Sequence, residues 1–273
     1  MNGAIENSIQ FNKCRIATFS KNSGEPTLLF VHGNSLSSKT FLEQFNSELL
    51  SDFQLVAFDF LGHGASDKSS NPEIDYTMSG NINQLIAVVN TISSNNIVIV
   101  GHSFGGHIVI EALPEIRKKV KGILLFGTPP ISLKVGFDQM FVSSPTFHFA
   151  FTSTLNEDEY LKWAASFVHN RNDLHEFLVD QIRIADPLFR SILGKSVGNG
   201  EFMDEINILE SLKIPLAIIH GKFDQIASYE YLSQVKFEKL WQGQIQLLHF
   251  GHSSQLEASV EFNKLIINFL SEL

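Results

Sequence analysis

The stretch Gly101-His102-Ser103-Phe104-Gly105 follows the apolar run Ile97–Val100. The apolar run predicts a buried strand, and the residues from about Phe104 onward predict a helix. Glycines flank a sharp turn where two backbones come too close for a Cβ. The residue between them must hold a strained backbone conformation, with its side chain clear of the sheet. The pattern therefore predicts that Ser103 presents its hydroxyl at the carboxyl end of a buried strand.

Further apolar runs alternate with segments of helical spacing on both sides of this turn. The predicted strands are 27–31, 55–58, 97–100, 122–126, 215–220 and 245–249; the predicted helices are 39–50, 78–92, 104–113 and 259–270. A short hairpin over 9–11 and 14–19 turns near Asn12-Lys13. Continuous apolar strands suit a parallel sheet covered on both faces. The alternation predicts an α/β fold with a mostly parallel, doubly wound sheet and a site at the carboxyl ends of its strands.

One segment, 132–204, interrupts the alternation, since it contains helical patterns and no clear buried strand. The clearest helices are 157–168, with Asn156 as N-cap, and 174–185. We interpret 132–204 as a helical lid inserted into a core of 1–131 and 205–273. Most of its apolar residues are expected in the lid core, and several are expected to line an apolar pocket: Phe137, Met140, Phe141, Phe147, Phe149, Phe151, Trp163 and Phe167.

Composition narrows the possible partners. The chain of 273 residues has a net charge of -9 and no dense basic patch, so nucleic acid and anionic membranes are not expected partners. A single cysteine, Cys14, allows no intrachain disulfide. Residues 1–13 lack the apolar core of a signal peptide, and no apolar run reaches the length of a membrane span. We therefore expect a cytoplasmic protein, monomeric or homodimeric.

A serine hydroxyl needs a base within hydrogen-bond reach to act as a nucleophile. His252 lies just after the last predicted strand, and Asp224 follows the strand that ends at His220. The order Ser, acid, His along the chain is that of serine hydrolases with a Gly-x-Ser-x-Gly turn. In such a triad Asp224 would orient His252, which would take the proton of Ser103.

Acyl transfer also needs donors for the developing oxyanion. Asn34 directly follows a strand, and Phe104 follows the predicted nucleophile, so their backbone N–H groups are the expected donors. Among the other histidines, His32 and His63 are expected to brace loops, and His107 to be buried and hydrogen-bonded. His102 is expected to point away from Ser103 and is a candidate for the pocket wall. The sequence contains no recognised metal-binding or nucleotide-binding motif, so no cofactor is expected.

Taken in order, His32-Gly33-Asn34, Asp59 to Ser66, the serine turn, Asp224 and His252 resemble the α/β-hydrolase fold superfamily over almost all of the chain except the lid. Serine at position 103 disfavours the chemistries of epoxide hydrolases and haloalkane dehalogenases, which have aspartate there.

A more specific resemblance lies in four strings: His32 to Ser35, Gly105 to Ile108, Gly127 to Pro130, and Val235 to Gly243. These strings are similar to the metal-independent N-acyl-homoserine lactonases of the same fold. The chain departs from that family at His102 in place of tryptophan, at Asp224 in place of glutamate, and at Trp163 in place of a substrate-contacting tyrosine.

The resemblance implies that Ser103 opens the ring of an N-acyl-homoserine lactone. His102, Phe141, Phe147 and Trp163 are the residues expected to bind substrate. Two alternatives remain among serine hydrolases, a carboxylesterase and an amidase acting on another apolar acyl substrate. A third is a ligand receptor on the same fold.

Overall fold

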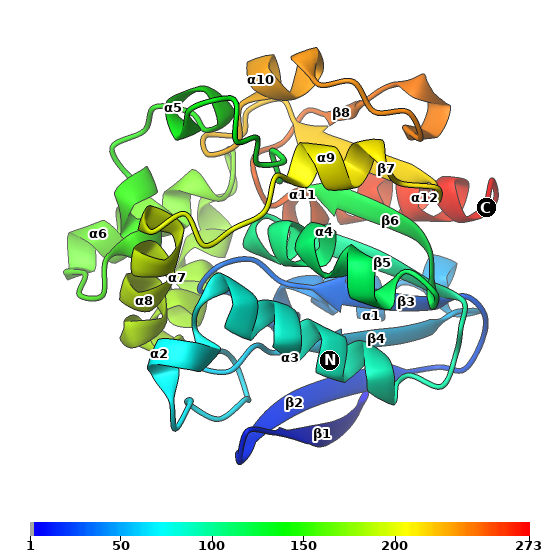
Figure 1. Cartoon of the computed structure of the whole chain (residues 1–273), viewed down its shortest axis with the longest axis horizontal. Helices are drawn as coiled ribbons and strands as arrows, with labels where there is room; N and C mark the ends of the chain where they lie inside the picture. The colour runs from blue at the N-terminus through cyan, green and yellow to red at the C-terminus, as the bar shows by residue number, and fades with distance from the viewer. Residues whose placement is uncertain (1–2) are drawn as a thin grey trace.

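A computed structural model describes residues 3–273 and contains one eight-stranded sheet (Figure 1). The strands are β1 (Ile5–Phe11), β2 (Cys14–Lys21), β3 (Thr27–Val31), β4 (Gln54–Phe58), β5 (Ile97–His102), β6 (Val120–Phe126), β7 (Leu216–Gly221) and β8 (Gln246–Leu248). Their order across the sheet is β1-β2-β4-β3-β5-β6-β7-β8. Strands β4, β3 and β5 to β8 pair in parallel, whereas β1–β2 and β2–β4 are antiparallel. The prediction of a mostly parallel α/β sheet is confirmed.

The hairpin at the sheet edge turns where the sequence predicted. Asn12 and Lys13 both have positive φ values, 47° and 69°. Two consecutive left-handed residues form the tight turn whose twist matches that of the flanking strands. The hairpin is longer than predicted, because β1 begins at Ile5 and β2 ends at Lys21.

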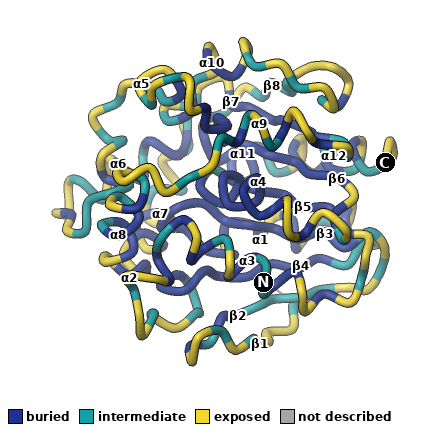
Figure 2. The backbone as a smooth tube through the Cα atoms, viewed as in Figure 1, coloured by how far each residue is buried: buried dark blue, intermediate teal, exposed yellow. Residues whose placement is uncertain are grey.

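Successive side chains of the central strands point to opposite faces, and each face has its own core. Leu29 and Ile99 belong to one cluster, whereas Leu28 and Val98 belong to the other. The first cluster lies under α3 (Met78–Thr91) and α4 (Phe104–Ile116), and the second under α1 (Leu42–Phe45) and α12 (Ser259–Leu270). Figure 1 shows these helices on either side of the sheet, and in Figure 2 the central strands are buried throughout. Burial on both faces explains the continuous apolar runs.

The inserted segment (132–204) is helical and lies at the carboxyl end of the sheet (Figure 1). Its helices are α5 (Phe137–Met140), η3 (Phe147–Phe151), α6 (Glu157–Ser166), η4 (Asn172–Leu174), α7 (His175–Ile184) and α8 (Pro187–Gly198). Asn156 caps α6 by accepting from the Glu159 N–H, while the Glu159 carboxylate accepts from the Asn156 N–H. The segment returns to the sheet through α9 (Glu205–Glu210).

The remaining helices are short. They are η1 (Ser38–Phe41), η2 (Glu48–Leu50), α2 (Pro72–Asp75), α10 (Tyr229–Gln234), η5 (Trp241–Gly243) and α11 (Ser254–Glu257). Within residues 3–273, no helix has both the length and the apolar character needed to span a membrane.

The predicted single helix over 39–50 is wrong. The segment forms three short pieces, η1, α1 and η2, because the chain leaves the helical conformation at Ser47, whose ψ is 127°. Asn46 and Ser47 compete for backbone hydrogen bonds and are poor residues for a helix interior. The apolar spacing of Phe41 and Phe45 reflects a shared buried face, not a continuous helix.

Candidate active site

Ser103 is the turn between β5 and α4, and its backbone is strained. It has φ 50° and ψ -121°, outside the regions that residues with a Cβ normally occupy. The neighbouring Gly105 is needed for space, because a Cβ there would lie 2.4 Å from the His32 carbonyl oxygen. The Ser103 N–H donates to the Phe126 carbonyl at 2.9 Å, and the Thr128 hydroxyl donates to the Ser103 carbonyl at 3.1 Å. These hydrogen bonds hold the turn in its strained conformation.

Asp224 and His252 form a buried hydrogen-bonded pair beyond the ends of β7 and β8. His252 Nδ1 lies 2.8 Å from Asp224 Oδ2 and 3.0 Å from Oδ1. Asp224 Oδ1 also accepts from the N–H groups of Ile226 and Ala227 at 2.8 and 2.9 Å. Burial alone would raise the pKa of Asp224. The facing imidazole of His252 and the hydrogen bonds that Asp224 accepts instead hold that pKa below its usual value.

The imidazole of His252 lies beside His102, the last residue of β5, with the two ring centroids 5.0 Å apart. The His252 carbonyl is 3.1 Å from His102 Nε2, and a Cβ on Gly127 would lie 2.8 Å from His252 Cε1. Gly127 has a positive φ of 59°, so the position favours glycine for its backbone as well as for space. His252 Nε2 is buried and has no hydrogen-bond partner within residues 3–273, the Ser103 hydroxyl included. The nitrogen that would take a proton is thus free of other partners.

Two backbone amides near Ser103 are available as donors. The N–H groups of Asn34 and Phe104 donate to no acceptor in the described part of the chain. Phe104 is the first residue of α4, so its amide also carries the positive end of the helix dipole. The side chain of Asn34 is occupied elsewhere, since its Nδ2 donates to the Ala150 carbonyl of η3 at 2.9 Å.

His32 and His63 brace the loops around the site, as predicted. His32 Nε2 accepts from the Phe60 N–H at 3.1 Å, and His63 Nε2 accepts from the Ser35 N–H at 3.2 Å. Burial lowers the pKa of both imidazoles, which keeps them neutral and able to accept through Nε2.

His102, expected in the pocket wall, is not among the residues that line the cavity at Ser103. Its side chain is fully buried behind the turn, stacked on Phe126 with ring centroids 4.5 Å apart. Its Nε2 is engaged by the His252 carbonyl. The side chain does point away from the nucleophile, but toward the sheet and not toward the pocket wall. His102 is the last residue of β5 and Ser103 forms the turn after it, so the two side chains leave the backbone in different directions.

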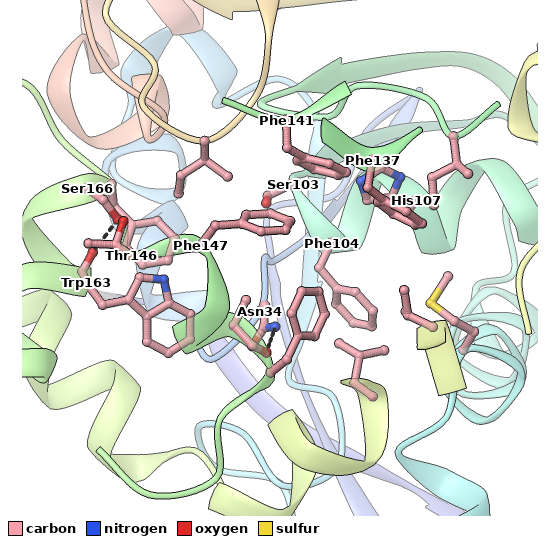
Figure 3. A pocket seen from close by; sticks show the side chains of 18 residues that line it. Asn34, Ser103, Phe104, His107, Phe137, Phe141, Thr146, Phe147, Trp163 and Ser166 are labelled. Carbon is pink, nitrogen blue, oxygen red and sulfur yellow. Dashed lines mark hydrogen bonds between the residues drawn. The ribbon is translucent and has the colours of Figure 1, made fainter. Parts of the chain in front are cut away.

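A mostly apolar cavity of about 90 Å³ opens beside Ser103 (Figure 3). Phe141, Phe147 and Trp163, three of the residues predicted to bind substrate, line it. In Figure 3 Phe147 and Phe141 lie beside Ser103, and Trp163 lies on the opposite side with Thr146 and Ser166. Other lining residues were not singled out as pocket residues from the sequence: Met78, His107, Ile131, Leu193, Val197 and Ile226. They come from five separate segments. Neither an apolar residue nor a buried histidine shows from the sequence alone whether it faces the core or the cavity.

His107 is buried and hydrogen-bonded, as predicted, and its partner is a second buried carboxylate, that of Glu205. Its Nδ1 lies 2.9 Å from Glu205 Oε2, and the same oxygen accepts from the Ile131 N–H at 2.8 Å. Glu205 therefore ties α4 to α9 and to the start of the inserted segment. Within residues 3–273, no three histidine, cysteine, aspartate or glutamate side chains gather in a way that could hold a metal ion.

Comparison with known proteins agrees with this arrangement. The model of the alpha/beta hydrolase fold family matches residues 26–178. AB hydrolase superfamily protein YisY of Bacillus subtilis is 24% identical over 259 residues, covering 90% of this chain and 91% of that protein. The bifunctional esterase/perhydrolase DCH of Acinetobacter calcoaceticus is 22% identical over 261 residues, with shares of 90% and 91%.

Among solved structures, the N-acyl homoserine lactonase AidH is similar over nearly its whole length. A mutant of AidH complexed with N-hexanoyl homoserine lactone has a TM-score of 0.90 and 27% identity, covering 97% of both chains. AidH complexed with N-butanoyl homoserine has the same TM-score and identity, covering 97% of this chain and 96% of that chain. The chain belongs to the α/β-hydrolase fold family and is close to AidH-type lactonases. The names of the lactonase AidH and the esterase DCH agree with the expectation of a hydrolase that acts on ester bonds.

Proposed function

We propose that this hydrolase opens the lactone ring of N-acyl-homoserine lactones, with Ser103, His252 and Asp224 as its catalytic triad. The observation that carries the proposal is the likeness to the lactonase AidH, which covers 97% of both chains, the inserted segment included. Triads and oxyanion donors serve all esters, so they do not select a substrate. The inserted segment builds most of the cavity at Ser103 and acts in this proposal as the lid.

The reaction begins when the Ser103 hydroxyl adds to the lactone carbonyl carbon and His252 Nε2 takes its proton. The oxyanion that forms accepts hydrogen bonds from the N–H groups of Asn34 and Phe104. Asp224 stabilises the imidazolium and keeps the Nδ1 proton in place. When the ring C–O bond breaks, His252 returns the proton to the departing alkoxide. The product is an ester between Ser103 and the homoserine carboxyl group, with a free homoserine hydroxyl.

Hydrolysis of this ester repeats the sequence with water. His252 takes a proton from the water, whose oxygen adds to the same carbonyl carbon, and the Ser103 oxygen leaves with the proton. Acyl-homoserine is released, and the free enzyme is restored. In this proposal the apolar side chains around the cavity hold the acyl tail, since roughly 0.8 kcal/mol is gained per buried methylene.

Acidification of the products tests the proposal. Purified protein is incubated with N-octanoyl-homoserine lactone, and the products are identified by mass before and after acidification. A lactonase yields N-octanoyl-homoserine, which acid converts back to the lactone. Octanoic acid and free homoserine lactone would instead identify an amidase. A protein that leaves the lactone intact but cleaves p-nitrophenyl octanoate is a carboxylesterase on another substrate.

The number of turnovers separates an enzyme from a ligand receptor on this fold. Product in large molar excess over protein supports the proposal, whereas tight binding with less than one turnover contradicts it. Metal independence is checked by adding a chelator, which is expected to leave the rate unchanged.

A further inference from the structure

A second apolar cavity adjoins the first and has no assigned role. It has a volume of about 740 Å³ and lies between α5, η3 and α8 of the inserted segment. Four of its lining residues also line the cavity at Ser103: Phe137, Phe147, Phe151 and Val197. The two spaces are therefore neighbours separated only by these side chains. We propose that this second cavity, the tail groove, binds the distal part of a long acyl chain whose carbonyl group lies at Ser103. The inference rests on the proposed function in requiring an acyl substrate.

The two volumes make the argument quantitative. The cavity at Ser103 holds about 90 Å³. An engineered cavity of roughly 150 Å³ holds one benzene molecule. The space at Ser103 is smaller than that, so side chains must shift before a lactone ring with its amide can enter, and little room is left there for a long tail. The tail groove is the adjoining space large enough to receive it.

The groove also has the chemical character that a hydrocarbon chain requires. Its inner wall consists of phenylalanines in mutual contact, with ring centroids 5.6 Å apart for both the Phe147–Phe151 and Phe137–Phe202 pairs. Its charged lining residue, Lys195, is exposed and its ammonium lies 3.9 Å from Glu73, at the outer rim. A polar head group would find few partners inside, whereas each buried methylene gains free energy.

Two glycines of α8 shape the groove in different ways: one allows close packing and the other leaves open space. A Cβ on Gly194 would lie 2.9 Å from the Phe151 Cβ, so this glycine lets α8 and η3 approach closely. A Cβ on Gly198 would meet nothing within 4 Å, although the residue lines the groove. The space beyond Gly198 is therefore open, and its exposed position marks the end of the groove toward solvent.

The inner end of the groove is closed by half-buried aromatic side chains. Phe147 lies beside Ser103 in Figure 3, with Phe137 beyond it next to His107. Both rings line the two cavities. A chain that extends from Ser103 into the groove must pass between them, so rotation of these rings connects the two spaces. Side-chain rotations of this kind need no backbone movement.

The test fills the groove from Gly198. The Gly198→Trp variant places an indole in the open space, on a helical backbone that accepts any residue with a Cβ. We measure kcat/KM for N-butanoyl-, N-octanoyl- and N-dodecanoyl-homoserine lactone, and in parallel for the p-nitrophenyl esters of the same acids. The expected result is a fall of at least about tenfold in the dodecanoyl-to-butanoyl ratio of kcat/KM, since each excluded methylene costs roughly fourfold.

Two further variants control for folding. Ser191→Phe narrows the same groove from another position and is expected to lower the same ratio. Leu188→Trp adds an indole to an exposed position of α8 that lines neither cavity, and is expected to leave every rate unchanged. Thermal unfolding shows whether each variant is folded.

The two substrate series distinguish the inference from the proposed function. An unchanged chain-length ratio in folded Gly198→Trp and Ser191→Phe proteins overturns the tail groove, whichever substrate is used. If the wild type hydrolyses no lactone but Gly198→Trp lowers the ratio for the esters, the lactonase function is wrong and the tail groove is supported.

Discussion

At Ser103 a strained backbone carries the hydroxyl of the proposed nucleophile. Its φ of 50° places a residue with a Cβ where glycine is normally found. Strain of this kind costs roughly 1–3 kcal/mol and is retained where the surrounding structure enforces it. The strained turn is what places the Ser103 hydroxyl above the carboxyl end of the sheet.

Substituting Ser103 with glycine and with alanine separates strain from chemistry. Both variants lack the hydroxyl and are expected to lose essentially all turnover. Ser103→Gly is expected to be more stable than Ser103→Ala by about 1 kcal/mol, because glycine adopts the positive φ without strain. Urea unfolding of the two inactive proteins measures the difference. Equal stabilities would mean that the turn relaxes when the hydroxyl is removed.

Asp224 is expected to act through the tautomer of His252. In Asp224→Asn the amide oxygen can still accept from the Ile226 and Ala227 N–H groups, which turns the amide NH2 toward His252 Nδ1. The imidazole proton then moves to Nε2, and the base can no longer accept from Ser103. We expect kcat to fall by about 10³–10⁴ with KM changed little.

The matched variant for Asp224 is Asp224→Glu, which keeps the negative charge and is expected to retain part of the rate. Steady-state kinetics on the lactone measures both variants. An Asp224→Asn protein with near wild-type kcat would remove Asp224 from the triad.

At this scale the sequence indicated the candidate site through the glycine-flanked serine after an apolar strand and through the chain order of serine, aspartate and histidine. Ser103, Asp224 and His252 follow the ends of β5, β7 and β8, and parallel strands bring such ends to one edge. The contacts of the His102 side chain could not be predicted from the sequence. Its inward direction depends on the turn of the backbone at Ser103, and its stacking on Phe126 depends on the register of β5 against β6.

Among the elements, α8 joins the inserted segment to the loops of the site through Arg190. This guanidinium is fully buried and donates to the carbonyls of Thr152 and Ser153 at 2.7 and 2.8 Å. It also donates to the Ser35 hydroxyl at 3.4 Å and lies 5.7 Å from the Trp163 ring centroid. Burial lowers the pKa of Arg190, but an arginine stays charged at any ordinary pH.

Removing this guanidinium is expected to loosen the inserted segment. Arg190→Met keeps the aliphatic bulk but leaves two partly buried carbonyls without their donors and loses the buried guanidinium, at a cost of roughly 3 kcal/mol. For a chain of this size that lowers Tm by on the order of 10 °C. Differential scanning calorimetry measures the change, with Arg183→Met on the exposed face of α7 as the control. A Tm within a degree or so of wild type would show that water replaces the lost donors.

The long elements could be predicted, and several short ones could not. Strands buried on both faces leave an unbroken apolar run, so β3 and β5 were found within a residue or two. Helix α8 was missed even though Asp186 and Pro187 form a clear start signal, because its buried face serves both the core and the two cavities. The pieces η1 and η3 are too short for any periodicity.

On the scale of the whole molecule, two kinds of buried titratable group change the stability of the fold with pH in opposite directions. Burial, together with the neighbouring charge of Glu205, raises the pKa of Glu111 to about 7. Its folded form binds a proton that the unfolded chain releases, so this group costs stability as the pH rises from about 4.5 to about 7. Burial lowers the pKa of His32, His63 and His102, and these groups cost stability as the pH falls below about 6.5.

The variant Glu111→Gln isolates the first of these effects. At about pH 8 it is expected to exceed the wild type in stability by on the order of 2 kcal/mol, or about 5 °C in Tm, and at about pH 5 to match it. Thermal unfolding at several pH values measures both. Acid destabilisation through the histidines is expected to be the same in the two proteins. A pH-independent gain would mean that the substitution acts through packing and not through the proton.

The loop that carries His252 is fastened to the inserted segment. The Ser253 N–H donates to the Phe167 carbonyl at 2.8 Å, and the Glu257 carboxylate accepts from the N–H groups of both His169 and Gly251 at 2.6 and 2.9 Å. Phe167 and His169 directly follow α6, so these hydrogen bonds couple the position of that helix to the loop that holds the imidazole. A displacement of the end of α6 would therefore have to break them or carry the His252 loop along with it.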